Sequence, residues 1–350
     1  MTTSIAKVKT IKLSVALAGF GCPNKEGKEG KYMYNQYAMN RRTRAKNGET
    51  FGVQTVDPTV DNCTFAKSNV YVDKDGNLDR KAKLSGDCIR HNIFGTIMNP
   101  AIKEDVTTLV AYIASHEGLV RGYLNPDKNG TTTKRKSPLT VTDAELDNDA
   151  VPQIETHSSS GARTDTSFFT KERYGKTHFS FEAFIDLSEL SVLSCSDTFD
   201  RPCVKEEHQQ LFEAQLKKNG IGFKKLALKK KNDHQGEVCY QLDDKSVNEL
   251  VNILLKKISN IHISNATEFV DFESMTVTFI KEDGTREEVK FTDGKLEKEF
   301  SVASQYEETD YDKALEAERL TREAIKGTKE KPAKKTSKKK SDKEETAETK

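Results

Sequence analysis

The chain has 350 residues, enough for one large domain or two ordinary ones. Apolar residues make up 35% and charged residues 32%, a polar balance that indicates long exposed segments around a core. The net charge is +1, so the sequence lacks the overall positive charge of a typical nucleic-acid-binding protein, and any such binding must use local basic patches. With no C-x-x-C pair and no run of 18 apolar residues, the sequence argues against a zinc ribbon and a membrane span; we expect a cytoplasmic protein with buried thiols.

The first predicted element is a strand over Val8–Leu17, where apolar and polar residues alternate. The pattern then breaks over Gly19–Gly52, a glycine-rich basic stretch that predicts a long exposed loop. Its arginines lie close to three tyrosines in sequence, and guanidinium groups bind phosphates while tyrosine rings stack on bases. We therefore interpret the loop as an RNA contact rather than a solvated charged loop, through Arg41, Arg42 and Arg44.

A hairpin is predicted over Asn69–Lys83, where two short strand patterns flank a turn. A helix should follow, with Ser85 as its N-cap and isoleucines recurring every fourth residue. Arg90 and His91 lie on this helix, whose first N–H groups and positive charge would suit a phosphate. The alternative is that Arg90 only extends its stem past the core.

Two further basic segments follow in the chain. Arg121 stands between Gly118 and Gly122, and glycines either let a backbone approach a ligand or simply form a turn. The second segment is a run of basic residues on an exposed connection. Such runs are usually solvated, but they are also able to contact phosphates. Its members are Lys134, Arg135 and Lys136.

The most informative segment is Glu155–Gly175, a polar arm that leads into an alternating strand over Phe179–Leu187. A two-stranded arm of this make-up cannot bury itself and needs a partner surface or a ligand. Hydroxyl and guanidinium groups are donors for phosphates and ribose hydroxyls, whereas the alternative is a surface hairpin packed on its own domain by its aromatic pair. The residues predicted to contact RNA here are Arg163, Phe168, Phe169 and Lys171.

The C-terminal half predicts helices over Glu206–Lys218, Lys245–Ile258 and Asp310–Ile325, and a hairpin over Met275–Phe291. Gly327–Lys350 contains no aromatic residue and is predicted to be disordered. Mixed strands and helices with long insertions indicate an α+β sheet domain that carries arms.

Motifs for catalysis are missing from the sequence: HExxH, GxSxG, the P-loop and GxGxxG do not occur. Cys88 and His91 lie three residues apart, a spacing that more often reflects packing than a catalytic dyad. We therefore expect no catalytic residues, no metal and no cofactor.

Two stretches resemble the RAMP superfamily of CRISPR backbone subunits, the proteins that polymerise along a guide RNA in multi-subunit interference complexes. Leu84–His91 is similar to the family's "hydrophobic-Ser-Gly-x-x-Ile-Arg" helix start. Ser158–Gly175, followed by Phe179–Leu187, is similar to its thumb hairpin and the strand that the hairpin re-enters. The order of the stretches agrees with the family, and the type I variant and type IV kinds are nearest.

The resemblance implies an α+β fold with an RRM-like (ferredoxin-like) palm and long finger and thumb insertions. It implies that Arg90 and His91 touch guide phosphates and that the arm from Arg163 to Phe169 kinks the guide. In this chain the palm would occupy residues 1–326 and the disordered tail 327–350, with insertions at 19–52 (basic loop), 53–150 (finger-like) and 155–178 (thumb-like). Some relatives cut target RNA with an aspartate in the loop after the first strand, and Gly19–Gly52 has none.

The function implied is a guide-RNA-binding backbone subunit that assembles head to tail with copies of itself and with other CRISPR subunits, and presents the guide to target DNA or RNA. One alternative is an RNA-processing endoribonuclease of the same superfamily, with His91 or His157 as its general acid–base. Another is a protein scaffold that uses its lysine-rich tail to bind partners.

Overall fold

The computed structural model describes residues 5–25, 63–72, 78–95, 105–126, 132–150, 152–158, 168–231 and 233–329. At its centre lies a long strand, β1 (Ala6–Phe20), between two antiparallel neighbours, β11 (Lys176–Asp186) and β16 (Phe269–Lys281). Alternate residues of β1 and β11 are buried, which is the pattern of a sheet with one covered face. The strands predicted over Val8–Leu17 and Phe179–Leu187 are confirmed and are longer than expected.

The central sheet continues on both sides of these three strands in the order β15-β16-β1-β11-β8-β4-β3. Three short strands branch from it: β17 pairs with β16, β20 with β1, and β7 with β11. The added strands are β3 (Ser68–Val72), β4 (Leu78–Leu84), β7 (Leu139–Val141), β8 (Ala144–Leu146), β15 (His262–Ser264), β17 (Arg286–Val289) and β20 (Phe300–Val302). The two predicted hairpins are confirmed as β3–β4 and β16–β17.

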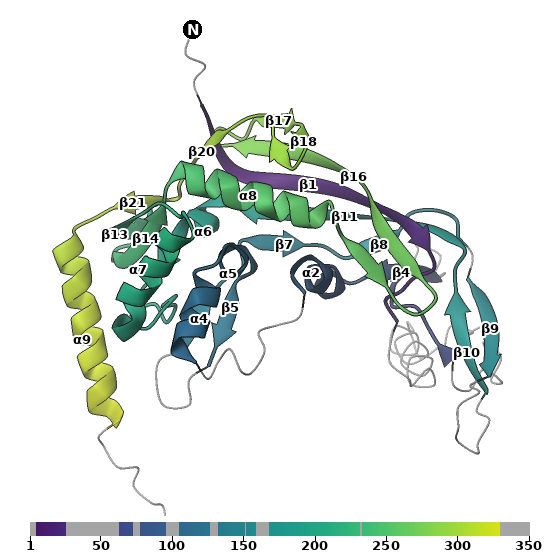
Figure 1. The fold of residues 1–350 in the computed structure, drawn as a ribbon, viewed down its shortest axis with the longest axis horizontal. Helices are drawn as coiled ribbons and strands as arrows, with labels where there is room; N and C mark the ends of the chain where they lie inside the picture. The colour runs from purple at the N-terminus through teal and green to yellow at the C-terminus, as the bar shows by residue number, and fades with distance from the viewer. Residues whose placement is uncertain are drawn as a thin grey trace, which may run out of the picture.

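Helices gather on one side of this sheet, as Figure 1 shows. The largest is α8 (Asp244–Ile258), which begins after the N-cap Asp243 and buries one apolar stripe from Val247 to Ile258. Below it in that view lie α2 (Gly86–Phe94), α4 (Val106–Ile113) and α5 (His116–Arg121), while α6 (Leu187–Ser191) follows β11 directly. The predicted N-cap Ser85 and the helix after it are confirmed.

A second sheet stands at one end of the molecule, in the order β12-β14-β13-β21. Its strands are β12 (Val192–Ser194), β13 (Phe223–Lys230), β14 (Glu237–Leu242) and β21 (Tyr306–Glu308). A 3-10 turn (Glu206–His208), α7 (Gln209–Lys218) and α9 (Tyr311–Lys329) complete this end. The helix α9 extends past residue 327, where a disordered tail was predicted to begin, and residues 330–350 lie outside the described residues.

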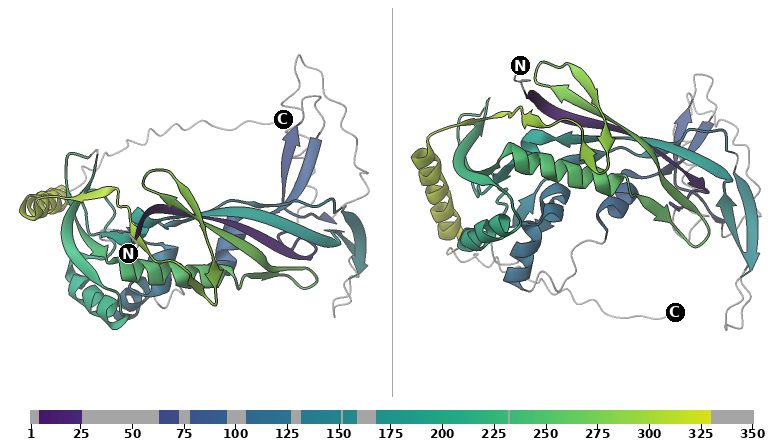
Figure 2. Two further views of the ribbon diagram at one scale, coloured as in Figure 1. Left: turned by 90° about the horizontal axis from the view of Figure 1, so that it is seen from above. Right: turned by 45° about the horizontal axis from the view of Figure 1, so that its top comes forward.

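The predicted arm lies at the opposite end of the long axis from α9 (Figures 1 and 2). Its strands β9 (Gln153–Ser158) and β10 (Phe168–Arg173) pair antiparallel, and β2 (Cys63–Thr64) adds to β10 in parallel, so the arm has three strands rather than two. Two small hairpins complete the described part: β5 (Tyr123–Asn125) with β6 (Thr133–Arg135), and β18 (Phe291–Thr292) with β19 (Lys295–Leu296).

The architecture is thus mixed α/β with a large, curved, mainly antiparallel sheet, which agrees with the predicted class at that level. Apolar residues from the central sheet, its helices and the second sheet form one continuous core. Five cysteines lie among the described side chains, all as free thiols and four of them buried. None of the described helices has the length and apolar character needed to cross a bilayer.

Candidate nucleic-acid interface

Buried apolar residues and a close approach to β7 fix the position of the helix α2. Ile89, Ile93 and Phe94 are buried beneath it. Gly86 lies against β7 so closely that a Cβ atom there would stand 2.7 Å from the carbonyl oxygen of Val141. This packing leaves Arg90 half-buried and the next residue, His91, exposed.

The N-terminus of α2 is not open to a ligand as predicted. The N–H of Gly86 donates to the Asp143 carboxylate at 2.9 Å, and the N–H of Cys88 donates to the Ser85 hydroxyl at 3.3 Å. The capping groups have therefore taken two of the donors that we expected to bind a phosphate.

Arg90 and Arg121 come together around the ring of Phe94. Their guanidinium carbons lie 5.7 and 5.9 Å from its centre, within the range of a cation–π contact. Arg90 donates to the carbonyl oxygen of Leu139 at 2.6 Å, to the Ser137 hydroxyl at 3.1 Å and to the carbonyl oxygen of Arg121 at 3.2 Å. Burial, and then the neighbouring charge of Arg121, lowers the pKa of Arg90.

Arg121 is the last residue of α5, and its guanidinium reaches the carbonyl oxygens of Phe94 and Gly95 at 3.5 and 3.4 Å. Its flanking glycines lie where two parts of the backbone pack closely together. A Cβ at Gly118 would meet the Tyr112 carbonyl oxygen at 2.3 Å, and one at Gly122 would meet the backbone nitrogen of Ser137 at 2.6 Å. These glycines therefore bring α4, α5 and the segment after β6 together.

The three consecutive basic residues Lys134, Arg135 and Lys136 lie in three different environments. Lys134 pairs with Asp200 at 2.6 Å, and Lys136 is exposed. Arg135 is buried, contrary to the exposed run that we expected, and its guanidinium donates to four carbonyl oxygens at 2.9 to 3.2 Å, those of Leu119, Glu189, Leu190 and Val192. Burial lowers the pKa of Arg135.

Beside Lys136 lies a cavity of about 500 Å³ with a cationic rim. Lys134, Lys136, Arg201 and Lys230 line it, and Tyr123 and Tyr306 contribute aromatic surface. Each of three rim cations has a carboxylate partner: Lys134 with Asp200, Arg201 with the buried Glu237, and Lys230 with Glu189. The positive surplus at this cavity therefore comes from Lys136 and from Arg135, whose guanidinium is bonded to backbone carbonyls.

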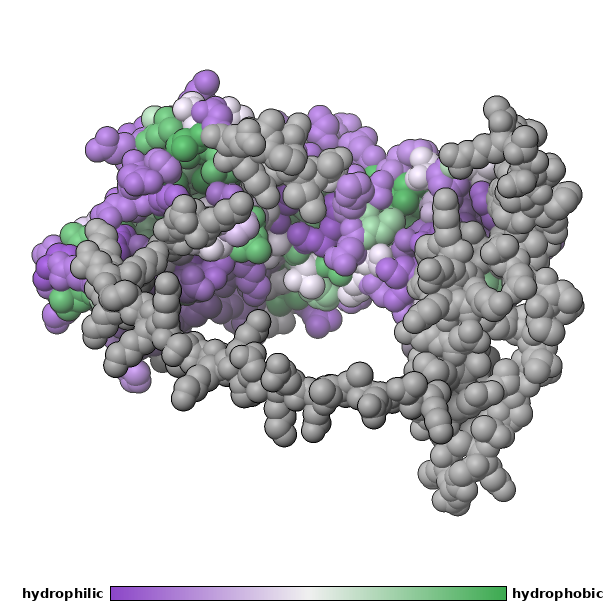
Figure 3. All heavy atoms as spheres, turned by 90° about the horizontal axis from the view of Figure 1, so that it is seen from below, coloured by the Kyte–Doolittle hydropathy of each residue, from purple (hydrophilic) through white to green (hydrophobic). Residues whose placement is uncertain are grey.

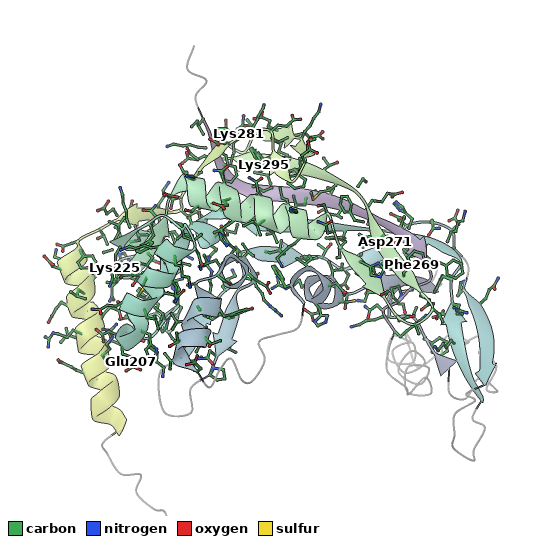
Figure 4. All side chains as sticks on the ribbon, in the orientation of Figure 1. Glu207, Lys225, Phe269, Asp271, Lys281 and Lys295 are labelled. Carbon is green, nitrogen blue, oxygen red and sulfur yellow. The ribbon has the colours of Figure 1, made fainter. Side chains whose placement is uncertain are left out.

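The arm is fixed at its base by a buried ion cluster that the sequence did not reveal. The ammonium of Lys25 donates to the Glu268 carboxylate at 2.9 Å and to the carbonyl oxygen of Glu172 at 2.7 Å. Glu172 in turn accepts from the backbone N–H of Ala66 at 2.8 Å. The cluster joins the end of β1, the arm and the β15–β16 hairpin, whose Phe269 Figure 4 shows on the arm side of the molecule. Partners 147 and 243 positions away in sequence leave no local signal for it.

The remaining predicted contacts lie on or near the arm and the basic loop. Phe168 and Phe169 open β10, and Lys171 in the same strand is half-buried. Arg41, Arg42, Arg44 and Arg163 lie outside the described residues. The structure thus brings Arg90 and Arg121 together around Phe94. His91 is exposed next to Arg90 on α2, and Lys136 is exposed one residue before Ser137, a hydrogen-bond partner of Arg90. The arm lies apart from α2 and α5 (Figure 1).

The helical side of the sheet forms the surface between the arm and α9. Figure 3 shows this underside, where hydrophilic residues cover most of the described surface. Among the described residues, groups of three or more side chains suited to hold a metal ion do not occur. We call the group Arg90, His91, Arg121 and Lys136 the α2–α5 cluster.

Comparison with known proteins gives a family. The family model described as "Type I-Fv CRISPR-associated protein Cas7fv-like" matches residues 7–309. One similar solved structure belongs to a CRISPR RNA-guided surveillance complex; it is 7% identical, with 77% of this chain and 68% of that chain covered, and its TM-score of 0.34 is too low to carry an argument. No curated protein matches the chain. The family match spans most of the sequence and agrees with the predicted kinship to CRISPR backbone subunits: the chain belongs to the type I-Fv CRISPR-associated Cas7fv-like family.

Proposed function

We propose that this chain, a guide-RNA-binding backbone subunit of a CRISPR interference complex, holds the RNA against the α2–α5 cluster. The observation that carries the site is the meeting of Arg90 and Arg121, from separate helices, around one ring. Two like charges at short range repel each other, and a phosphate near them relieves that repulsion. His91 follows Arg90 on α2, Lys136 precedes the Arg90 partner Ser137 in the chain, and both are exposed.

We further propose that Arg90 positions the neighbouring groups, while Arg121 and Lys136 bind the phosphates of the RNA. The guanidinium of Arg90 already makes hydrogen bonds to three protein oxygens, which orient it and the end of α5. Lys136 is exposed, and Arg121 adds a second guanidinium beside that of Arg90, with Glu117 of its own helix 3.8 Å away, so both bring positive charge that suits a phosphate. Arg135 serves the fold in this proposal, because its buried guanidinium is directed to backbone carbonyls.

The strand order supports an RRM-like palm as part of the proposal. Four antiparallel strands stand in the order β16-β1-β11-β8, with α2 between β1 and β8 in sequence and α8 between β11 and β16. This is the βαββαβ connectivity of a ferredoxin-like unit. Because α2 and β8 belong to the palm in this arrangement, the finger would be the rest of 53–150, the thumb would be the arm 155–178, and the basic loop would be 19–52.

A holding role rather than a cutting role is favoured by the side chains around the cluster. Cys88 is half-buried, and desolvation raises the pKa of its thiol, which disfavours a nucleophilic thiolate beside His91. The segment 19–52 has no aspartate to act on a target strand. We propose that target DNA or RNA pairs with the guide while this subunit, in a head-to-tail row of copies with other CRISPR subunits at its ends, keeps the guide in place.

Equilibrium binding of a labelled guide RNA tests the site. Arg121→Ala and Lys136→Ala should each weaken binding and lower the slope of log K against log salt by about one, because each removes a phosphate contact. A matched control is Lys224→Ala, an exposed lysine at the far end of the molecule, on β13. Equal slopes for all three variants and the wild type would reject the α2–α5 cluster as the phosphate site.

A further inference from the structure

A groove of about 560 Å³ crosses the face of the central sheet opposite the helices. Its floor consists of the small residues Ser14, Ala16, Ser180 and Ser274, from three adjacent strands. The wall is formed by β4 and the β7–β8 segment, and β3–β4 stands off the sheet beside it (Figure 2). Small side chains on a flat sheet leave room for an extended backbone to approach closely.

Carboxylates dominate the lining of this groove. Asp143, Glu145, Asp147 and Glu182 line it, with Lys81 as the cation among the described lining residues. Three of these carboxylates have basic partners in the fold: Asp143 pairs with Lys83, Asp147 with His178, and Glu182 with Lys12. Glu145 instead accepts from two neutral donors, the Asn69 amide at 2.5 Å and the Tyr71 hydroxyl.

The groove is therefore unsuited to RNA and suited to a cationic segment. The same chain supplies one after α9. Residues 331–340 read KPAKKTSKKK, with six lysines and no acidic residue. Residue 340 lies 11 residues beyond Lys329, so a fully extended segment 331–340 reaches about 38 Å from the end of α9.

We propose that the lysine-rich segment 331–340 of one copy docks in the acidic groove of the adjacent copy, an inference that rests on the head-to-tail assembly proposed above. The helix α9 lies at the end of the molecule opposite the arm (Figure 1), so the segment that follows it starts from one end of the long axis. Each lysine–carboxylate pair on a surface is weak alone, but several pairs on a tethered segment act together at high effective concentration. The link is electrostatic and weakens as salt rises.

Zero-length cross-linking of lysines to carboxylates tests the proposal on the full chain assembled with guide RNA. Equal amounts of ¹⁵N-labelled and unlabelled chain are mixed, and cross-linked peptides are read by mass spectrometry. Peptides that join 331–340 of one isotope to residues 143–147 or Glu182 of the other are expected. Cross-links from Lys335 should disappear when the other five lysines become Gln, and cross-links to Asp143 should disappear when Glu145→Gln, Asp147→Asn and Glu182→Gln are combined. Each variant keeps the amine and the carboxylate whose coupling is read, so a loss reports loss of docking.

The matched control neutralises three exposed carboxylates elsewhere, Glu288→Gln, Glu297→Gln and Glu299→Gln, and should leave the cross-links intact. Three outcomes would overturn the proposal if the chain still assembles on RNA. They are cross-links within a single isotope only, attachment of the segment to the RNA, and cross-links that survive in both test variants. Failure of the wild-type chain to bind or assemble on RNA would instead overturn the proposed function, and with it this inference.

Discussion

At the residue scale, Lys25 is the side chain on which the arm's attachment depends. It is the cation beside Glu268, whose carboxylate is 2% exposed, so Lys25→Met leaves a buried charge without its partner. We expect a loss of about 3 kcal/mol in the free energy of unfolding, measured by urea denaturation.

Two variants separate the loss of this ion pair from the general effect of removing a lysine. Lys9→Met removes an exposed lysine from β1 and should change stability by less than about 0.5 kcal/mol. Lys25→Met with Glu268→Gln removes both charges and should recover part of the loss. A double variant no more stable than Lys25→Met alone would contradict the buried ion pair as the cause.

His178 provides a pH dependence at the same scale. Hydrogen bonds to Asp147 at 2.5 Å and to Glu273 at 2.6 Å raise its pKa, against a smaller effect of burial. A histidine whose pKa is raised in the folded state stabilises the fold. This contribution is fully present below the pKa of the unfolded state and is lost as pH rises through the pKa of the folded state. Relative to His178→Gln, the wild type should therefore be more stable near pH 5 than near pH 9, and a constant difference in thermal midpoint across that range would contradict this.

Sequence reasoning was strongest for local features of single residues. Ser85 was recognisable as a cap because Ser followed by an apolar i, i+4 pattern has a local cause. The burial of Arg135 was not recognisable, because the four carbonyls that it binds come from α5, α6 and β12, far away in sequence. For the same reason the sequence showed basic residues at Arg90 and Arg121 without showing that they share one ring.

At the scale of elements, the seating of α2 on β7 determines where Arg90 and His91 stand. Gly86→Ala adds a Cβ only 2.7 Å from the Val141 carbonyl oxygen, so the helix or the strand must shift. We expect a loss of about 1–3 kcal/mol in stability, together with weaker guide-RNA binding. Gly175→Ala is the control, because nothing lies within 4 Å of a Cβ there, and similar effects from both variants would argue against this packing.

Elements with a strong hydrophobic period were predictable, whereas their partners were not. The strands β1 and β11 and the helix α8 followed from alternation and from the apolar stripe. The second sheet escaped sequence analysis because β12 and β21 have three residues each and carry little pattern. The third strand of the arm, β2, has only two residues.

At the scale of the whole molecule, Arg135 connects the helical layer to the second sheet. Its guanidinium joins the carbonyl oxygen of Leu119, at the end of α5, to that of Val192, at the start of β12. Both regions belong to one continuous core, so we expect the described body to unfold in a single transition, with circular dichroism and tyrosine fluorescence in agreement.

Arg135→Leu keeps most of the side-chain volume but leaves four buried carbonyls without their donor, at a cost of about 1–3 kcal/mol for each group that finds no water. Stability should fall, and the two optical probes should separate if the connection between the layers carries the cooperativity. Lys136→Leu, one residue later and exposed, is the matched control and should leave the unfolding transition single. Because Lys136 is a proposed phosphate contact and Arg135 is not, the control variant should bind RNA less well while folding normally. The opposite outcome, with Arg135→Leu fully stable but deficient in RNA binding, would mean that the buried guanidinium serves the RNA rather than the fold.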